Sequence, residues 1–343
     1  MNRFSSEINI YLLFVKAGRT DQRMTNVERY DGLCKQESSI PLFSKKWWLD
    51  AVCGENCWDA AIVEKGGQVI GTMPYTVKKR MGFTLLTQPP LTQTLGPWIR
   101  PLEAKYSTVL GYQKDVMEAL IGQLPRFDHF SQNWHYSNTN WQPFYWKGFK
   151  QKTYYTYMLD DLQNEEALWN GIEPKIRTDI KKATDRFQLK VRDDLGWQDF
   201  FDMSTKTFGR QKMAVPYSAD IVERIDRACE KRGCRKIWIA EDARGRRHAG
   251  AYIVWDENSA YYLMGGGDPE LRHSGATSMV VWAAIKHAAT VTKTFDFEGS
   301  MLEPVERFFR GFGAQQVPYF HISKTPSFIL RLREAVLMLA GKR

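Results

Sequence analysis

Apolar and polar positions alternate along several stretches of the chain, which predicts strands in both halves. The first two strands lie within residues 58–77, where Gly66-Gly67 marks a hairpin turn. A strand in residues 83–96 and another in 127–136 follow. The later strands include an antiparallel meander and two final strands: 154–159, 236–242, 249–256, 260–267, 293–299 and 319–323.

Apolar residues at helical spacing predict helices between these strands, over residues 103–124, 165–187, 218–232 and 277–289, and another helix follows between the strands at 293–299 and 319–323. The second helix carries an apolar stripe, and basic residues occupy its other faces. Helices and strands thus follow one another in two similar passages. The pattern predicts an α/β (α+β) protein in which each passage is a mixed, largely antiparallel sheet flanked by helices. The apolar stripe of the helix predicted over 165–187 consists of Ile172, Ile176, Ile180, Ala183 and Phe187.

Composition indicates a globular chain whose partners are anionic. Of 343 residues, 43% are hydrophobic and 25% charged, which excludes a disordered protein. The net charge of +9 favours phosphorylated cofactors, nucleotide sugars, nucleic acid or an acidic membrane surface. The charge alone does not choose among these partners.

The five cysteines and the N-terminus indicate a reduced, cytoplasmic protein. An odd number of cysteines at these spacings, with no histidine nearby, predicts neither a disulfide framework nor a zinc site. No stretch approaches the ~20 apolar residues that a membrane span needs. The apolar run at residues 8–15 lacks a signal-peptide cleavage site, so we interpret it as an extension or a leading strand, and translation could begin at Met24.

The stretch "MGGGDPELRHSGATSMVVWAAIKHA" combines a glycine-rich strand end with the start of a helix. Free backbone N–H groups at a helix start, beside a glycine and an arginine, can bind a pyrophosphate. An ordinary glycine-rich loop with a surface arginine explains the same residues equally well. The candidate binding residues are Gly265, Gly266, Gly267, Arg272, Gly275 and Ala276.

The stretch "FDFEGS" places two carboxylates, Asp296 and Glu298, on one face of an apolar strand. Burial would raise the pKa of such a carboxyl and make it a better general base near neutral pH. In the alternative interpretation, Ser300 and Glu303 form a capping box at a helix start. Either carboxylate could also pair with an arginine of that helix, Arg307 or Arg310.

Other residues are weaker candidates. Tyr261 or Tyr262 could reprotonate a leaving group, or the two could be an aromatic core pair. His273 and His321 fit structural roles better than catalytic ones. The basic segment 175–187 could bind phosphates, although a solvated cationic face is the simpler interpretation.

The C-terminal segment 325–343 is amphipathic and basic. An apolar stripe of Leu332, Val336 and Leu339 is predicted, with Arg331, Arg333, Lys342 and Arg343 around it. Packing of this stripe against the body of the protein is the default expectation. Peripheral docking on an anionic inner membrane leaflet is the alternative.

Together, "KIRTDIKKA", "ELRHSGAT", "FDFEGS" and "RFFRGFGAQ" resemble the Fem-like branch of the GNAT superfamily of acyltransferases. That branch holds peptidoglycan aminoacyltransferases and related acetyltransferases of polysaccharide synthesis. The resemblance implies an extension at 1–26, a first GNAT-like domain at 27–150, a second at 151–324 and a terminal helix at 325–343. It assigns the pyrophosphate of coenzyme A to the loop "ELRHSGAT" (residues 270–277) and the acyl thioester to the strand that ends in Gly265–Gly267.

The resemblance implies an enzyme that transfers an acyl group, such as acetyl, from acetyl-CoA or another acyl-CoA without a metal. The acceptor would be an amine or hydroxyl on a sugar, peptide or nucleotide-linked precursor of a cell-envelope polymer. Glu298 or Asp296 would act as base and Tyr262 as acid. Aminoacyl-tRNA is the alternative donor, although nothing in the chain resembles the long helical arm of the peptidoglycan aminoacyltransferases. A non-catalytic binding module is a third hypothesis. DNA is not expected as a partner.

Overall fold

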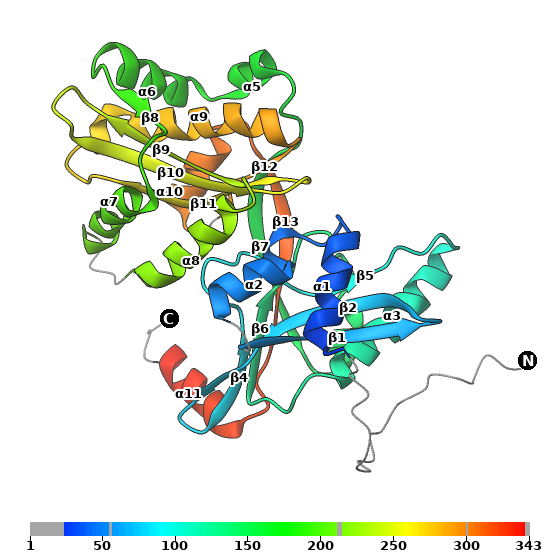
Figure 1. Cartoon of the computed structure of the whole chain (residues 1–343). Helices are drawn as coiled ribbons and strands as arrows, with labels where there is room; N and C mark the ends of the chain where they lie inside the picture. Colours follow the sequence, from blue (N-terminus) through cyan, green and yellow to red (C-terminus); the bar gives the residue numbers. More distant parts are fainter. Residues whose placement is uncertain (1–23, 55–56, 211–214, 300, 340–343) are drawn as a thin grey trace, which may run out of the picture.

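The computed structural model describes residues 24–54, 57–210, 215–299 and 301–339 (Figure 1). The predicted apolar run at 8–15 lies outside these residues. Within the described residues, no helix is both long enough and apolar enough to cross a bilayer.

The strands form two sheets. The smaller sheet, in the first half of the chain, contains β1 (Trp58–Lys65), β2 (Gln68–Thr76) and β5 (Trp98–Ile99). The predicted hairpin at Gly66-Gly67 joins β1 to β2. The larger sheet has ten strands, in the order β3 (Lys78–Arg80), β4 (Phe83–Thr87), β6 (His129–Asn133), β13 (Gln315–Lys324), β7 (Lys150–Leu159), β12 (Phe295–Asp296), β11 (Ala260–Gly267), β10 (Arg247–Trp255), β9 (Arg235–Glu241) and β8 (Lys190–Arg192).

The last strand, β13, joins the two halves of the molecule. It runs antiparallel to β7, from Gln315 opposite Met158 to Ser323 opposite Lys150. Its other edge pairs with β6 of the first half. The predicted α/β fold class is confirmed, but the sequence did not indicate that one sheet would run through both halves. The domain boundaries at residues 26, 150 and 324 stay a prediction.

Helices cover both faces of the larger sheet in the second half (Figure 1). Residues of α6, α9 and α10 build one apolar core with the sheet, and residues of α7, α8 and α2 build another on the opposite face. The helices are α1 (Asn26–Gln36), α2 (Lys46–Cys53), α3 (Tyr106–Gly122), α4 (Gln142–Trp146), α5 (Glu165–Gly171), α6 (Pro174–Asp185), α7 (Trp197–Arg210), α8 (Ala219–Glu230), α9 (Ala276–Val291), α10 (Glu303–Arg310) and α11 (Phe328–Leu339).

Three predictions of local structure were wrong. The helix predicted over 165–187 is two helices, because Pro174 restricts the preceding residue to extended backbone, and Glu173 has ψ 143°. Helix α7 was missed altogether. The strand predicted over 83–96 ends at Thr87. The buried stripe nevertheless packs as expected, with Ile172, Ile176, Ile180 and Ala183 all in the core.

Candidate functional site

A groove of about 330 Å³ lies where β11 ends and α9 begins. Its floor is the glycine end of β11, and apolar side chains of α10 form one wall. The groove therefore combines backbone groups with an apolar wall, which is the usual composition of a small-molecule site. Its lining consists of His248, Tyr262, Gly265, Gly266, Gly267, Asp268, Pro269, Arg272, Thr277, Val305, Phe308 and Phe309.

Strand β11 is irregular beside this groove. Its pairing with β10 slips by one residue, so that Leu263 has no partner between Tyr262 and Met264. On its other edge, β11 pairs with β12 only at Ala260 and Tyr261. From Tyr262 to Gly266 this edge has no strand partner among the described residues, so backbone groups there are available to a ligand.

The structure brings most of the predicted pyrophosphate residues to this groove. Arg272 lines it, within a short 3-10 turn before α9, and Ala276 is the first residue of that helix. Gly275 has φ 83°, and a Cβ there would lie 2.1 Å from the carbonyl oxygen of Asp179 in α6. The missing side chain of Gly275 thus makes room for α6, in addition to any contact with a ligand.

The glycines at the end of β11 adjoin groups on both faces of the sheet. A Cβ on Gly265 would meet the Tyr262 hydroxyl at 1.9 Å, while one on Gly266 would meet the backbone of Ser204 in α7 at 2.9 Å. Burial raises the pKa of the Tyr262 phenol, so this group stays protonated near neutral pH and can donate a proton. Tyr262 packs against Phe309, with ring centroids 5.9 Å apart.

Asp296 is 2% exposed and pairs in register with Tyr261. The Thr156 hydroxyl and the Glu298 backbone N–H, the latter at 2.8 Å, both donate hydrogen bonds to its Oδ1. Burial raises the pKa of the Asp296 carboxyl to about 6, although these hydrogen bonds act in the opposite direction. Asp296 is thus a buried carboxylate that titrates close to neutral pH.

Glu298 follows in a left-handed backbone conformation, with φ 57°. This conformation is uncommon and costly for a residue with a side chain, so the surrounding structure must hold it in place. Its Oε1 is buried and has no hydrogen-bond partner among the described residues. Burial first, and then the charge of Asp296, raise the pKa of Glu298 well above its usual range. The next residue, Gly299, leaves no space for a Cβ, which would lie 2.1 Å from the carbonyl oxygen of Tyr155.

Of the two competing interpretations of these carboxylates, the ion pair with Arg307 or Arg310 is not present in the part of the chain that the structure describes, and the capping box involves Ser300, which lies outside that part. Helix α10 begins at Glu303, with Leu302 in the N-cap position. Arg310 pairs instead with Glu306, at 2.9 Å. Within the described residues, no lysine or arginine forms an ion pair with Asp296 or Glu298, so the buried Asp296 and the half-buried Glu298 lie close together without a neutralising partner.

The carboxylates and the groove lie on opposite faces of the sheet. Phe295 and Phe297 belong to the core under α9 and α10, as Tyr262 does, whereas Asp296 shares its face with Tyr261. Tyr217 lies between the groove and the acids. Burial has the largest effect on its phenol and raises the pKa; the Ser204 hydroxyl lowers this pKa, and the charge of Glu298 raises it. The open edge of β11 lies between the groove and the acids.

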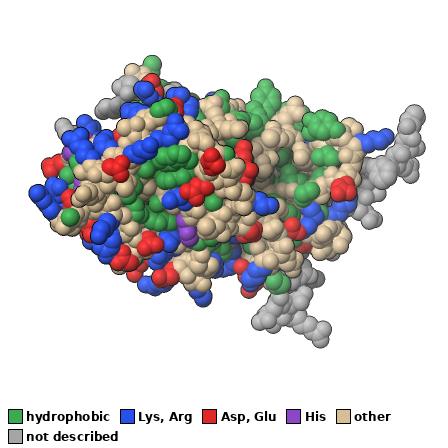
Figure 2. All heavy atoms as spheres, turned by 90° about the horizontal axis from the view of Figure 1, so that it is seen from above, with side chains coloured by type: hydrophobic (Ala, Val, Ile, Leu, Met, Phe, Trp, Pro, Cys, Tyr) green, Lys and Arg blue, Asp and Glu red, His purple; other side chains and the backbone are tan. Residues whose placement is uncertain are grey.

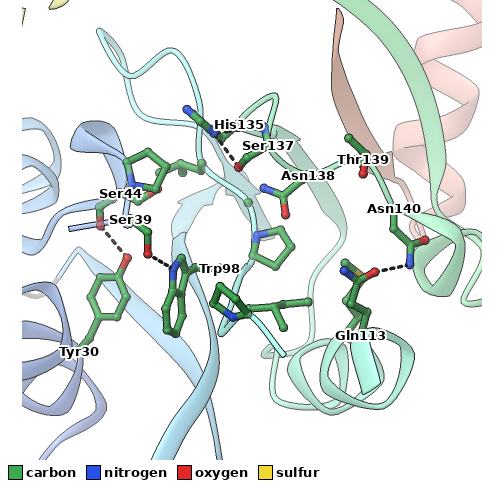
Figure 3. A pocket seen from close by; sticks show the side chains of 17 residues that line it. Tyr30, Ser39, Ser44, Trp98, Gln113, His135, Ser137, Asn138, Thr139 and Asn140 are labelled. Carbon is green, nitrogen blue, oxygen red and sulfur yellow. Dashed lines mark hydrogen bonds between the residues drawn. The ribbon is translucent and has the colours of Figure 1, made fainter. Parts of the chain in front are cut away.

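A second pocket, of about 250 Å³, lies in the first half of the chain (Figure 3). Its lining presents hydroxyl and amide groups together with the edge of Trp98, whose Nε1–H donates to Ser39 Oγ at 2.9 Å. Asn140 donates to Gln113 Oε1 at 3.0 Å on the opposite wall. These bonds fix the side chains around the cavity in Figure 3.

No aspartate, glutamate, lysine or arginine is among the residues that line this pocket. Its one titratable imidazole, His135, is neutral near pH 7 because burial lowers its pKa to about 4. Nδ1 of His135 accepts from the Ser137 backbone N–H at 3.3 Å, which leaves Nε2–H as a donor. The pocket suits an uncharged ligand with many hydroxyl groups.

The pocket adjoins the buried acids through one loop. Residues 135–140 supply five of its lining residues, and Tyr136 of the same loop lies near Asp296, whose charge adds to burial in raising the pKa of the phenol. Asp256 and Asp160 act on Tyr136 in the same direction. The two halves of the chain therefore meet at the carboxylates.

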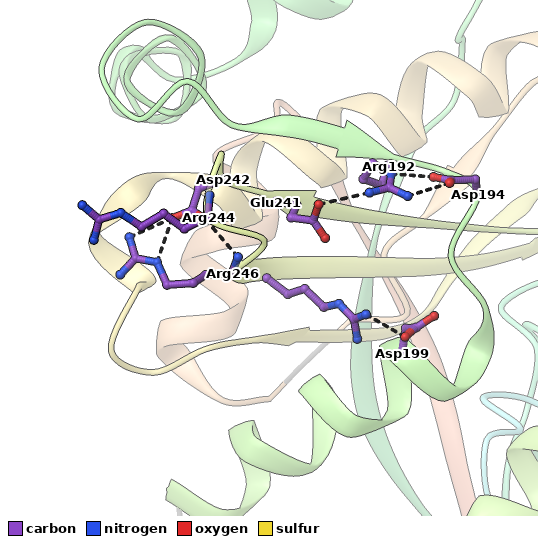
Figure 4. A network of polar contacts seen from close by, with 8 residues as sticks. Arg192, Asp194, Asp199, Glu241, Asp242, Arg244 and Arg246 are labelled. Carbon is purple, nitrogen blue, oxygen red and sulfur yellow. Dashed lines mark hydrogen bonds and ion pairs between the residues drawn. The ribbon is translucent and has the colours of Figure 1, made fainter.

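Ion pairs fix the edge of the second half near the groove (Figure 4). Arg192 pairs with Asp194 at 2.7 Å and Glu241 at 3.0 Å, which ties β8 to β9. Asp242 binds Arg246 and lies 3.3 Å from His248 Nε2, and so orients an imidazole that lines the groove. Seen from above, Lys and Arg side chains are numerous on this side of the molecule, interspersed with acidic ones (Figure 2).

The remaining candidates have structural surroundings. His321 Nδ1 lies 2.7 Å from Asn133 Oδ1, between two strands, and the His273 ring packs against Phe187. The five cysteines are free thiols. Among the described residues, no cluster of His, Cys, Asp and Glu could hold a metal ion.

Residues 174–309 match the family model described as an acetyltransferase (GNAT) domain. This part of the chain is thus similar to a GNAT domain. It contains the groove, its glycines, Arg272 and both carboxylates. A search of curated proteins finds no significant match.

Solved structures share the fold of most of the chain. FemX matches with a TM-score of 0.63 at 14% identity, over 87% of this chain and 96% of its own. L-PGS from Bacillus licheniformis matches at 0.54 and 9% identity, over 93% and 98%. The C-terminal domain of a protein assigned as a lysylphosphatidylglycerol synthetase, from Agrobacterium fabrum, matches at 0.52 and 13% identity, over 93% and 98%. The predicted Fem-like resemblance is confirmed for the fold.

Sequence reasoning missed the pocket of the first half and the part that α7 plays. Ser39, Trp98 and residues 135–140 are far apart in the sequence and carry no spacing that would link them. Ser204 lies in a helix that the apolar pattern did not reveal. The one sequence signal of this contact was Gly266, because a glycine at a strand end allows another backbone segment to approach closely.

Proposed function

We propose that this protein transfers an acyl group from acyl-CoA to an amine or hydroxyl on an uncharged sugar unit of a cell-envelope or polysaccharide precursor. The GNAT domain over residues 174–309 is the observation that carries the donor side of this proposal. The acceptor side rests on the pocket of the first half.

The groove at the end of β11 would hold the thioester. Its open backbone edge can donate N–H groups to the thioester carbonyl, which develops negative charge during attack. Arg272 and the start of α9 lie where they could bind the pyrophosphate, since both line or border the groove. In this arrangement Tyr262 would return a proton to the departing sulfur.

The buried acids would take the proton from the acceptor. In the reaction, the acceptor nitrogen or oxygen bonds to the acyl carbon as the carbon–sulfur bond breaks. Burial raises the pKa of Asp296 to about 6, and burial and the charge of Asp296 raise the pKa of Glu298 well above its usual range. Because the two acids titrate as neighbours, we assign the base to this pair.

Ligand-dependent thermal unfolding tests the donor. Acetyl-CoA or free CoA at about 100 times its Kd should stabilise the fold by about 2.7 kcal/mol and raise Tm by a few degrees, and ATP should not. Arg272→Ala should abolish the shift, while Arg227→Ala, an exposed arginine of α8, should keep it. No shift with either CoA compound would refute an acyl-CoA donor.

Release of free CoA thiol then tests the acceptor. Amino sugars without phosphate or carboxylate groups should support turnover, and nucleotide-linked sugars should do so less well, because the pocket has no cation to meet a phosphate. Asn138→Asp should weaken acceptor use without changing the thermal shift with CoA. Equal turnover with acceptors that carry a phosphate or carboxylate group and acceptors that carry neither would contradict the assignment of the pocket.

Aminoacyl-tRNA is the second candidate donor. The specific observation in its favour is the basic surface of α6, where Lys175 and Lys181 are exposed. Binding of tRNA that weakens steeply with salt, without any thermal shift by CoA, would favour this donor.

A further inference from the structure

Helix α11 presents its apolar stripe away from the protein. The three predicted stripe residues are exposed: Leu332 and Val336 by 56% each and Leu339 by 90%. Phe328 and Ile329, on the same side of the helix, are 70% and 64% exposed. The expectation that this stripe packs against the body is therefore wrong.

A different side of α11 faces the body. Leu330, Glu334 and Leu337 are its half-buried residues. Glu334 lies near the first half, 3.4 Å from the Thr325 hydroxyl and 3.8 Å from His129 Nδ1. The helix is thus held in one orientation, with its apolar stripe outward.

Positive charge flanks the stripe. At about 100° of turn per residue, Arg331 and Arg333 lie on the two opposite borders of the apolar face. The only acidic residue of the helix, Glu334, is on the side toward the body. An apolar strip bordered by arginines is the arrangement of a helix that lies in a bilayer interface.

The β3–β4 hairpin extends this surface. It exposes Lys78, Lys79 and Arg80, and at its tip Met81 is 88% exposed. Asp128 connects this hairpin to α11: its carboxylate accepts from the Thr84 N–H at 2.9 Å, and its carbonyl accepts from the Ser327 N–H at 3.4 Å.

Hairpin and helix lie at the same end of the molecule, away from the helices of the second half (Figure 1). They form one basic and apolar surface, which we call the docking face. It consists of residues 78–81 of the hairpin together with Phe328, Ile329, Arg331, Leu332, Arg333, Val336 and Leu339 of α11.

We propose that the docking face binds the surface of an anionic lipid bilayer, with the α11 stripe inserted at the headgroup level. Charge complementarity decides in favour of this partner. In a symmetric pair of chains joined through α11, the flanking arginines of one copy would approach those of the other, with no acid on that face to neutralise them. Anionic headgroups supply that negative charge, and the acyl region accepts the apolar stripe.

Co-sedimentation of the full chain with vesicles tests the proposal. We expect binding to vesicles of phosphatidylcholine and phosphatidylglycerol in equal parts, and little binding to phosphatidylcholine alone. Arg331→Gln and Arg333→Gln should each weaken binding about fivefold, since each basic residue near such a surface contributes about that factor. Leu332→Ser with Val336→Ser should remove it. The matched controls are Arg227→Gln on α8 and Leu110→Ser on α3, both exposed sites away from the docking face.

Each outcome of the vesicle-binding experiment either supports or overturns the proposed membrane contact. Binding that needs phosphatidylglycerol, falls with salt and is lost only in the α11 variants supports the proposal. Failure to bind, equal binding to neutral vesicles, or equal loss in the controls overturns it. A concentration-dependent dimer that Leu332→Ser dissolves, without vesicle binding, would assign the stripe to a second copy instead. None of these measurements depends on acyl transfer.

Discussion

Replacing Asp296 by asparagine should make the protein more stable at alkaline pH while impairing its chemistry. Both hydrogen bonds to this side chain, from Thr156 and from the Glu298 N–H, end on Oδ1, and asparagine can accept both there. The substitution therefore removes a buried charge and keeps the local contacts. The change in the free energy of unfolding therefore measures how much a buried carboxylate at position 296 destabilises the fold.

The structure sets the size and sign of the effect. The pKa of Asp296 rises from 3.8 to about 6 in the folded protein. An acid whose pKa is raised in the folded protein stabilises the fold at pH values below its unfolded pKa. This stabilisation is lost as the pH rises through the folded pKa, here about 6. At about 1.4 kcal/mol per pKa unit, the folded protein bears a cost of about 3 kcal/mol at pH 8 that Asp296→Asn removes. Between pH 8 and pH 5 the difference should shrink by about 1.4 kcal/mol.

Urea unfolding of both proteins across this pH range measures the difference. Both should carry Glu298→Gln, so that no second buried acid titrates with Asp296. Asp202→Asn, at an exposed site of α7, is the matched control and should show no such pH dependence. A stability difference that stays constant from pH 5 to pH 8 would refute the assignment of a raised pKa to Asp296.

Three further predictions concern the site. If Asp296 is the base, the rate of acyl transfer should rise with pH through about 6, and Asp296→Asn should remove that rise. If Glu298 is the base, the rise should lie above the usual range of a glutamate, and Asp296→Asn should move it to lower pH because the charge of Asp296 raises the pKa of Glu298. A pH–rate profile that Asp296→Asn leaves unchanged would exclude both assignments. Gly275→Ala should cost about 2–4 kcal/mol in urea unfolding, because φ is 83° and the new methyl meets a carbonyl of α6; an unchanged midpoint would contradict this. Gly96→Ala should likewise destabilise the fold and reduce acceptor use, since its Cβ would lie 2.7 Å from the Trp134 ring; acceptor KM and unfolding midpoint together check this.

Local patterns determined most of the elements that build the site. The meander 236–267 and the helix after it follow from alternation and helical spacing, and the structure has β9, β10, β11 and α9 there. The hairpin at Gly66-Gly67 and the buried stripe of α6 are of the same kind. These signals are local, because a side chain's burial repeats with the period of its own helix or strand.

The carboxylates were found from the sequence for a similar reason. Two acids in an apolar strand are costly, so their presence at Asp296 and Glu298 was itself a signal. Their surroundings were not readable: the left-handed backbone of Glu298 and the hydrogen bond from Thr156 depend on the turn against β7. Protonation follows from burial, which depends on contacts from distant segments.

By itself the sequence determined the elements, the apolar faces and the residue types of the candidate site. Only the tertiary structure decided how they combine: that β13 returns to pair with β6, that α7 approaches Gly266, and that an uncharged pocket adjoins the acids. The outward stripe of α11 is the clearest case, since helical spacing shows that a stripe exists but not which way it faces. That direction is set by the long-range contacts that anchor the helix, and such contacts leave no periodic trace in the chain.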